Sequence, residues 1–263
     1  MIDIFKATLL GIIEGLTEFL PVSSTAHLLI SSYLIDFNAI QNNLFEIVIQ
    51  LGAILAICVV YKEKILSTVV NINDKKSQKF SLNIIIAFMP AAILGLLFHD
   101  FIKKTFFSNY SIAIALIVGG IAMLIFDRKD QQDTKATNID DVTPKQALLI
   151  GLFQSLAMIP GTSRSGATII GGLITGLNRQ TATEFSFFLA IPTIAAATFF
   201  DLFQNLDSLN YNNIGLILVG LVSSFFSALV VIKWFISFVS KNSFLPFALY
   251  RIVIGIIILL TIA

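Results

Sequence analysis

Six apolar stretches of this chain are each about long enough to cross a lipid bilayer, which takes a helix of about 20 residues. They run over residues 45–61, 81–99, 110–126, 184–203, 214–235 and 245–262. In lipid the backbone must satisfy its own hydrogen bonds, and stretches of this length do so as helices. Hydrophobic residues make up 56% of the 263 residues and charged residues only 13%, about half the charged share of soluble domains. We therefore expect an all-α integral membrane protein with a single membrane domain over residues 1–263.

Two further apolar segments, 7–20 and 146–159, are too short to cross the membrane. Each holds about 14 residues, which is roughly 21 Å of helix against a hydrocarbon core of about 30 Å. Each stops at a proline, which is followed by hydroxyl residues and a second short apolar run, at 26–35 and 166–177. Interrupted apolar segments of this kind are typical of binding sites built from broken helices. We expect each pair to be re-entrant, turning at mid-depth in the membrane.

A polar linker at 127–143 divides the chain into two halves with the same order of segments, a re-entrant pair and then three spans. The first repeat covers residues 1–126 and the second covers 144–263. When the halves are aligned at a constant offset, the matched positions include Gly11 and Gly151, Glu14 and Gln154, Ser23 and Ser163, Phe45 and Phe185, and Ile54 and Ile194. Because three is an odd number of spans, the second half begins on the opposite side of the membrane. The pattern predicts an inverted-topology repeat, as in many transporters.

The distribution of Lys and Arg predicts the orientation. The side that carries the linker receives most of these residues, whereas the opposite side receives Lys6, Lys103 and Lys104. Cytoplasmic loops carry an excess of positive charge. We therefore expect a cytoplasmic linker, with both termini outside the cytoplasm.

Composition excludes several classes of function. The net charge is +1 and no basic tract is interleaved with aromatic residues, so no nucleic-acid partner is expected. Cys58 is the only cysteine, which rules out a disulfide framework and a thiolate metal site. The N-terminal segment contains Glu14 and Glu18 and lacks a cleavage site, so we do not expect a signal peptide.

Glu14 and Glu18 lie in the first short apolar segment, where ionisable groups are costly and are by default candidates for function. Being four residues apart, they share one face of a helix. Their mutual repulsion would be relieved by a shared proton or by a divalent cation held between carboxylate oxygens. The alternative is a structural pair whose hydrogen bonds are satisfied across helices.

Hydroxyl residues begin the second helix of each hairpin. The Ser-Ser-Thr run at 23–25 follows the first proline, and a helix start offers free N–H groups that bind anions. Ordinary capping would use the same residues. In the second hairpin Ser163 and Ser165 flank Arg164, whose planar guanidinium can grip two phosphate oxygens. The alternative for Arg164 is neutralisation of the carboxylates of the first hairpin.

His27, three residues after Ser24, is the candidate general acid or base because its ordinary pKa lies near 6.5. It could activate a hydroxyl nucleophile or protonate a leaving phosphate, and a structural histidine is the alternative. Arg251 lies inside the last span, where an arginine is costly. We expect it to approach the site or to pair with a buried carboxylate.

Together these residues indicate a site that binds an anion, most simply phosphate, at membrane depth. A cationic clamp, oriented donors and a positioned nucleophile are what cleavage of a phosphate ester or anhydride requires. A membrane transporter or flippase of a phosphorylated lipid or anion is the alternative from another class, because inverted repeats are shared with transporters. A noncatalytic lipid-binding scaffold is the third.

Four segments resemble the undecaprenyl pyrophosphate phosphatase family, also known as the bacitracin-resistance family. They are GIIEGLTEFLPVSSTAHL at 11–28, FEIVIQLGAILA at 45–56, PGTSRSGATIIGG at 160–172 and TEFSFFLAIP at 183–192. The resemblance implies hydrolysis of undecaprenyl pyrophosphate to undecaprenyl phosphate and inorganic phosphate, which recycles the carrier lipid for peptidoglycan synthesis. It also implies a multi-pass protein among the lipids of the bacterial plasma membrane, a site toward the extracytoplasmic face, a Mg²⁺ or Ca²⁺ cofactor, and bacitracin resistance. A homodimer is compatible with it.

The same resemblance implies roles for residues of the two hairpins. Glu14 and Glu18 correspond to the acidic pair that holds the metal. Ser24 corresponds to the nucleophile, His27 to its activator or acid, and Arg164 to the pyrophosphate clamp. Supporting phosphate contacts would come from Ser23, Thr25, Ser163, Ser165 and Thr168. Attack by Ser24 and attack by a metal-bound water both remain open.

Overall fold

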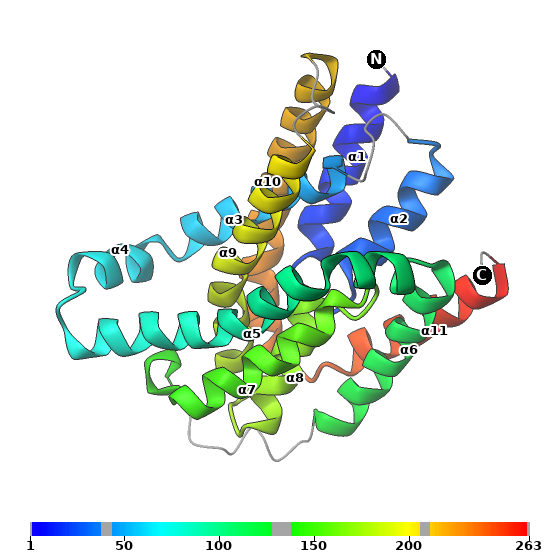
Figure 1. Ribbon diagram of the computed structural model, residues 1–263. Helices are drawn as coiled ribbons and strands as arrows, with labels where there is room; N and C mark the ends of the chain where they lie inside the picture. Colours follow the sequence, from blue (N-terminus) through cyan, green and yellow to red (C-terminus); the bar gives the residue numbers. More distant parts are fainter. Residues whose placement is uncertain (1, 38–43, 128–137, 206–210, 262–263) are drawn as a thin grey trace.

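The computed structural model describes residues 2–37, 44–127, 138–205 and 211–261, which are helical apart from short turns (Figure 1). The helices are α1 (Ile2–Thr17), α2 (Ser24–Leu34), α3 (Leu44–Val60), α4 (Lys62–Val70), α5 (Lys75–Phe106), α6 (Asn109–Phe126), α7 (Pro144–Ser155), α8 (Arg164–Ile174), α9 (Arg179–Gln204), α10 (Tyr211–Val239) and α11 (Leu245–Thr261). Two short 3-10 turns, η3 (Ile139–Asp141) and η4 (Leu156–Met158), flank α7. No strand occurs within these ranges, which confirms the expected all-α class.

All six stretches expected to cross the membrane lie on helices. Four helices are long and apolar enough to cross: the Lys75–Phe98 part of α5, α6, α9, and the Ile214–Val239 part of α10. α3 gives a fifth candidate only together with α4, from which it is bent by 74°. α11 is apolar but has 17 residues. The fold is therefore that of a multi-pass membrane protein, and the sequence pattern missed α4 as a separate helix.

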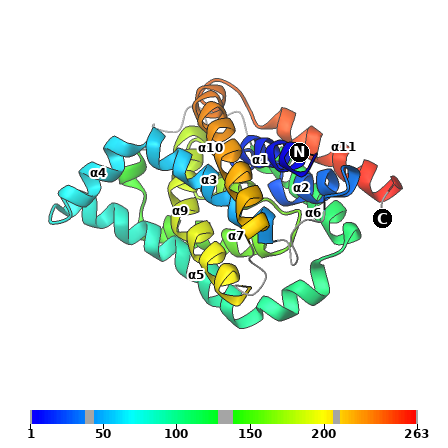
Figure 2. The same cartoon turned by 90° about the horizontal axis from the view of Figure 1, so that it is seen from above.

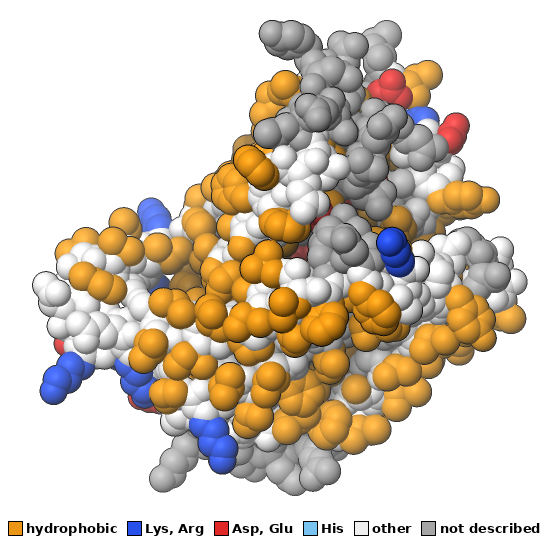
Figure 3. Space-filling model, viewed as in Figure 1, with side chains coloured by type: hydrophobic (Ala, Val, Ile, Leu, Met, Phe, Trp, Pro, Cys, Tyr) orange, Lys and Arg blue, Asp and Glu red, His pale blue; other side chains and the backbone are white. Residues whose placement is uncertain are grey.

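The outer surface is suited to lipid. Figure 3 shows apolar side chains over much of the visible face, with basic side chains around α4 and the first turns of α5 and α7. Leu97, Phe203 and Val230 are each at least 70% exposed. Large exposed apolar patches mark contacts with a membrane or a protein partner, and here they lie on the helices that are long enough to cross a bilayer.

The two short apolar segments form helical hairpins. A turn at 18–23 joins α1 to α2, and a turn at 159–163 joins η4 to α8. Each turn ends on the N-cap residue of the next helix, Ser23 or Ser163, with φ of 73° and 71°. Gly161, at φ 91°, lies so close to α6 that an added Cβ would sit 2.5 Å from a backbone oxygen. Only glycine fits both the angle and the space at that position.

Each hairpin begins with a helix that packs against the other half of the chain. α1 lies along α10 and α7 lies along α5, whereas α6 pairs with α11 (Figures 1 and 2). An added Cβ on Gly15 would lie 2.0 Å from the Ser227 hydroxyl, so this glycine lets α1 and α10 approach closely. Small residues at such contacts are typical of helices packed in membranes. The largest buried cluster includes Phe185, Phe187 and Phe235 and draws residues from both halves of the chain.

Both ends of the expected linker are packed against helices. Asp127 accepts from Arg179 Nε at 2.5 Å and from the Phe244 backbone N–H at 2.6 Å. These bonds join the end of α6 to the start of α9 and to the turn between α10 and α11. At the other end, Asn83 on α5 donates to the Val142 carbonyl at 2.6 Å.

Asp140 in η3, at the C-terminal end of the expected linker, contacts lysines of α4 and α5. Its carboxylate pairs with Lys64 and, at 3.2 Å, with Lys76, and its carbonyl accepts from Lys79 at 3.2 Å. Burial raises the pKa of the Asp140 carboxyl, but the hydrogen bonds and charges of Lys64 and Lys76 outweigh burial and hold the pKa below its ordinary value. The middle of the expected linker, 128–137, lies outside the described residues.

Candidate active site

The turns of the two hairpins line one cavity of about 640 Å³. Its polar lining includes Glu18, Ser23, Ser24, Thr25, Gln154, Ser163 and Arg164. An apolar wall comes from α5, within 88–96, and from α9, within 194–200. A cavity that is polar at one end and apolar along one wall suits an amphiphile with an anionic head group.

Glu18 connects the two hairpins. Its Oε1 accepts from Arg164 Nη2 at 2.9 Å, and its Oε2 accepts from the Ser24 hydroxyl at 2.6 Å. Glu18 is 7% exposed, so the pair with Arg164 is nearly buried, and removing either partner would leave a costly unpaired charge. The structure thus brings together three residues that the sequence singled out, although they come from opposite halves of the chain.

Glu14 lies one helical turn before Glu18 and is fully buried. Neither of its carboxylate oxygens has a hydrogen-bond partner among the described residues. A buried carboxylate without a partner requires a proton or a cation. The described part of the chain holds no group of three or more His, Cys, Asp or Glu side chains arranged for a metal. A cation held by Glu14 and Glu18 would take its other ligands from water and phosphate oxygens, as Mg²⁺ commonly does, and the two residues fit that use.

Arg164, the first residue of α8, is held in place by Ser186 of α9. Its Nη1 donates to the Ser186 carbonyl at 2.9 Å and lies 3.3 Å from the Ser186 hydroxyl. The guanidinium carbon lies 5.9 Å from the centre of the Phe19 ring. Arg164 Nε is buried and has no hydrogen-bond partner among the described residues. Sequence reasoning missed Ser186, although the TEFSFFLAIP segment contains it.

Three other hydroxyl residues of the second hairpin form hydrogen bonds within the protein: Ser163, Ser165 and Thr168. Ser163 accepts from the Gly166 backbone N–H at 3.1 Å and so caps α8. Ser165 donates to a carbonyl in the turn of the first hairpin at 2.8 Å. Thr168 lies 2.7 Å from the Ser186 hydroxyl. Ser165 and Thr168 do not line the cavity, which places them as supports of the turn, whereas Ser163 lies at its surface.

His27 is within hydrogen-bond distance of the turn of the first hairpin and of α11, and it does not contact the Ser24 hydroxyl in this way. Its Nδ1 lies 2.7 Å from the Ser23 carbonyl, and its Nε2 lies 2.6 Å from the Tyr250 hydroxyl. Since a carbonyl only accepts, Nδ1 carries the proton of the neutral ring and Nε2 accepts from Tyr250. The two rings are stacked, with centroids 5.5 Å apart. The group that accepts from Ser24 is therefore Glu18, and Tyr250 is a contact that sequence reasoning missed.

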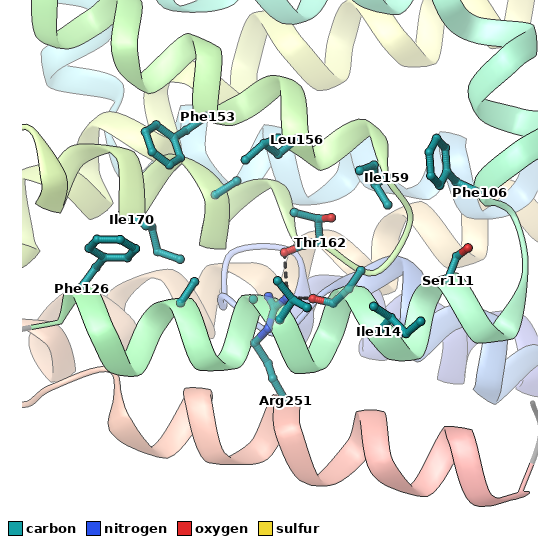
Figure 4. A pocket seen from close by; sticks show the side chains of 15 residues that line it. Phe106, Ser111, Ile114, Phe126, Phe153, Leu156, Ile159, Thr162, Ile170 and Arg251 are labelled. Carbon is teal, nitrogen blue, oxygen red and sulfur yellow. Dashed lines mark hydrogen bonds between the residues drawn. The ribbon is translucent and has the colours of Figure 1, made fainter.

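Arg251 reaches from α11 to the turns of both hairpins, and Figure 4 shows its hydrogen bond to Thr162 of the second turn. It donates to the Pro21 carbonyl at 3.0 Å in the first turn. It also donates to the Gly161 and Thr162 carbonyls in the second turn, at 3.1 and 2.9 Å, and to two carbonyls of α6. Its side chain is 1% exposed and also borders a second, apolar cavity of about 450 Å³. Arg251 does approach the site, but its partners are backbone carbonyls of the two turns and of α6, and not the buried carboxylate considered from sequence.

Comparison with known proteins identifies relatives over nearly the whole chain. The sequence model of the family described as bacitracin resistance protein BacA matches residues 7–257. The undecaprenyl-diphosphatase of Methylobacillus flagellatus is 52% identical over 260 residues, which cover 97% of this chain and 97% of the relative. The enzyme of the same name from Nitrosomonas europaea is 50% identical over 98% of this chain and 94% of its own length. The one from Acinetobacter baumannii is 50% identical over 98% of this chain and 95% of its own length.

Proposed function

This chain belongs to the bacitracin resistance protein BacA family, and we propose that it is an undecaprenyl-diphosphatase. It hydrolyses undecaprenyl diphosphate to undecaprenyl phosphate and inorganic phosphate, which returns the carrier lipid to cell-wall synthesis. The observation that carries the proposal is Glu18, which bonds Ser24 through one oxygen and Arg164 through the other at the polar end of the cavity. The polar end fits a diphosphate, and the apolar wall fits a prenyl chain.

We propose Ser24 as the nucleophile and Glu18 as its base. Ser24 Oγ attacks the terminal phosphorus, its proton passes to Glu18 Oε2 at 2.6 Å, and the bond from that phosphorus to the bridging oxygen breaks. Undecaprenyl phosphate leaves, and water then attacks the phosphoserine, which releases inorganic phosphate and restores the hydroxyl. Arg164 Nε and the free N–H groups that begin α2 and α8 stabilise charge on the transferred phosphoryl group. His27 supports this turn through the Ser23 carbonyl.

Rapid quenching separates serine attack from attack by water. A phosphoserine should form within the first turnover and should be missing in Ser24→Ala. Release of phosphate in a single turnover without any phosphoenzyme would overturn serine attack and favour a water nucleophile.

We propose Mg²⁺ or Ca²⁺ as the cofactor, held by Glu14 and Glu18. When bound, the cation would supply positive charge to the phosphate oxygens. The two Glu14 oxygens without a hydrogen-bond partner support this assignment. A chelator should abolish phosphate release, and added Mg²⁺ should restore it. Glu14→Gln should also weaken direct Mg²⁺ binding in calorimetry.

Phosphate release by the purified protein in detergent tests the activity itself. Wild-type protein should release phosphate from a prenyl diphosphate with Mg²⁺ present and no gradient. Glu18→Gln should lower the rate at least about 100-fold, because the variant loses the base. Glu63→Gln, at an exposed glutamate on α4, should keep the wild-type rate. No release by the wild type, together with uptake of a phosphorylated lipid by vesicles, would point to a transporter.

We propose an inverted repeat of two re-entrant hairpins, with the site open toward the extracytoplasmic face of the bacterial plasma membrane. Two relationships support the repeat: the matched φ angles of Ser23 and Ser163, and the packing of α1 along α10 and of α7 along α5. The orientation rests on the distribution of Lys and Arg. A reporter fused after Ala263 should be active outside the cytoplasm, and activity inside would contradict this topology.

A further inference from the structure

Gln154 is a buried amide with bonding capacity that the protein does not use. It lies near the end of α7, is 1% exposed and lines the cavity between the hairpins. Its Oε1 accepts from the Thr193 hydroxyl at 3.2 Å. Its Nε2 has no hydrogen-bond partner among the described residues. Buried polar groups are normally paired, so an unpaired donor on a cavity wall points to a ligand.

The Thr193 hydroxyl cannot take up the spare capacity of the amide. It has a single hydrogen, and it lies 2.7 Å from the Leu189 carbonyl as well as 3.2 Å from Gln154 Oε1. As the amide is placed, both hydrogens of Gln154 Nε2 lack an acceptor among the described residues. Gln154 therefore has donor capacity to offer a ligand in the cavity.

The position of Gln154 indicates which part of the ligand it meets. The terminal phosphate must lie against Ser24 and Arg164 to be attacked, and the prenyl chain must lie along the apolar wall. Thr193 comes directly before that wall on α9, next to Ile194. The pair of Gln154 and Thr193 thus adjoins the apolar wall of the same cavity that Ser24 and Arg164 line.

The two hairpins carry opposite hydrogen-bonding groups at matched positions. Gln154 is the counterpart of Glu14 in the second half of the chain, and both side chains are buried with unpaired polar atoms. Glu14 offers only acceptors, which suit a cation, whereas Gln154 offers donors, which suit an anion. We infer that Gln154, supported by Thr193, forms a neutral donor subsite for the phosphate that stays on the prenyl chain. This inference rests on the proposed function.

Product inhibition by farnesyl monophosphate tests the subsite, because that molecule carries the chain-linked phosphate alone. In Gln154→Ala the inhibition constant of farnesyl monophosphate should rise about tenfold, as expected for loss of a hydrogen bond to a charged group. Inhibition by inorganic phosphate should stay unchanged. Gln154→Glu, which is nearly isosteric, should raise the constant further, because a carboxylate repels phosphate. Thr193→Val should give a smaller rise.

The shift of the unfolding temperature on binding farnesyl monophosphate is a second measurement of the subsite. Farnesyl monophosphate should raise the unfolding temperature of the wild type and of Gln180→Ala, whose exposed side chain bonds Glu184, and should raise it less in the Gln154 variants. Equal constants for farnesyl monophosphate in the wild type, Gln154→Ala and Gln154→Glu would overturn the subsite. If Gln154→Ala does not fold, the inhibition constants of farnesyl monophosphate for Gln154→Glu and Thr193→Val provide the test. Failure of the wild type to release phosphate from farnesyl diphosphate would instead overturn the proposed function.

Discussion

Ser23 and Ser163 occupy matched places in the two halves of the chain and hold the same left-handed backbone conformation, with φ of 73° and 71°. A residue with a side chain rarely adopts this conformation, and the strain costs about 1–3 kcal/mol. Both residues precede the first turn of a helix that borders the cavity. The backbone conformation of these two residues therefore sets the direction in which α2 and α8, with their first N–H groups, leave the turns.

Glycine substitutions should separate strain from capping at these two positions. Ser23 makes no side-chain cap bond, whereas Ser163 accepts from the Gly166 backbone N–H. Ser23→Gly should raise stability by about 0.5–1 kcal/mol because glycine relieves the positive φ. Ser163→Gly should gain little stability, because loss of the hydrogen bond that caps α8 offsets the relief of strain. Thermal unfolding in detergent measures both, and a lower unfolding temperature for Ser23→Gly would contradict the assignment of strain.

Arg251 should be required for stability because it binds carbonyls of both turns. Arg251→Met leaves those carbonyls unpaired, at about 1–3 kcal/mol for each buried group, and should lower the unfolding temperature strongly. Arg251→Lys keeps the charge, but an ammonium has three donors and cannot span the two turns and α6. Arg251→Lys should therefore have an unfolding temperature between those of Arg251→Met and the wild type. Full stability of Arg251→Met would show that the turns hold together without this residue.

Asp127 should stabilise the fold without a role in chemistry. Its carboxylate joins Arg179 to the backbone N–H of Phe244, far along α6 from the turns. Removing one partner from such a buried pair costs about 3–5 kcal/mol, so Asp127→Ala should unfold at a much lower temperature. Asp127→Asn retains an acceptor, so its unfolding temperature should fall less than that of Asp127→Ala. At a temperature where both variants are folded, phosphate release per folded molecule should equal that of the wild type.

Asp140 should make stability fall in acid. Its folded-state pKa lies below the ordinary value, so its ion pairs with Lys64 and Lys76 contribute stability above that ordinary value, near pH 4. This contribution is lost as the pH falls through the lowered pKa. Unfolding temperatures between pH 3 and pH 7 should therefore drop less for Asp140→Asn than for the wild type. Parallel curves for the two proteins would contradict the assignment.

Local sequence patterns were sufficient to predict the long apolar helices and to single out two residues that the structure brings together. Apolar run length located the six long helical stretches, and the prolines located both hairpin turns. The free-energy cost of burying a charge singled out Glu18 and Arg164, because a charge in an apolar segment needs a partner. In the structure these two residues form an ion pair at 2.9 Å.

Contacts between distant helices could not be predicted in the same way. Nothing near Tyr250 in the sequence indicates that its hydroxyl meets His27, because the contact depends on how α11 lies beside α2. The buried charge of Arg251 was evident, but three of the carbonyls it binds belong to turns whose geometry the sequence does not specify. α4 escaped prediction because the chain bends sharply after α3 without a proline or glycine at the break.

The packing of α1 along α10 has a consequence for biosynthesis. Because α1 precedes α10 in the chain, it can pack there only after the segments between them have been made. Glu18 gains its partner Arg164 when the second hairpin has been made, and the close contact of Gly15 with α10 forms later still. The proposed active site, which needs both hairpins, therefore assembles late in synthesis.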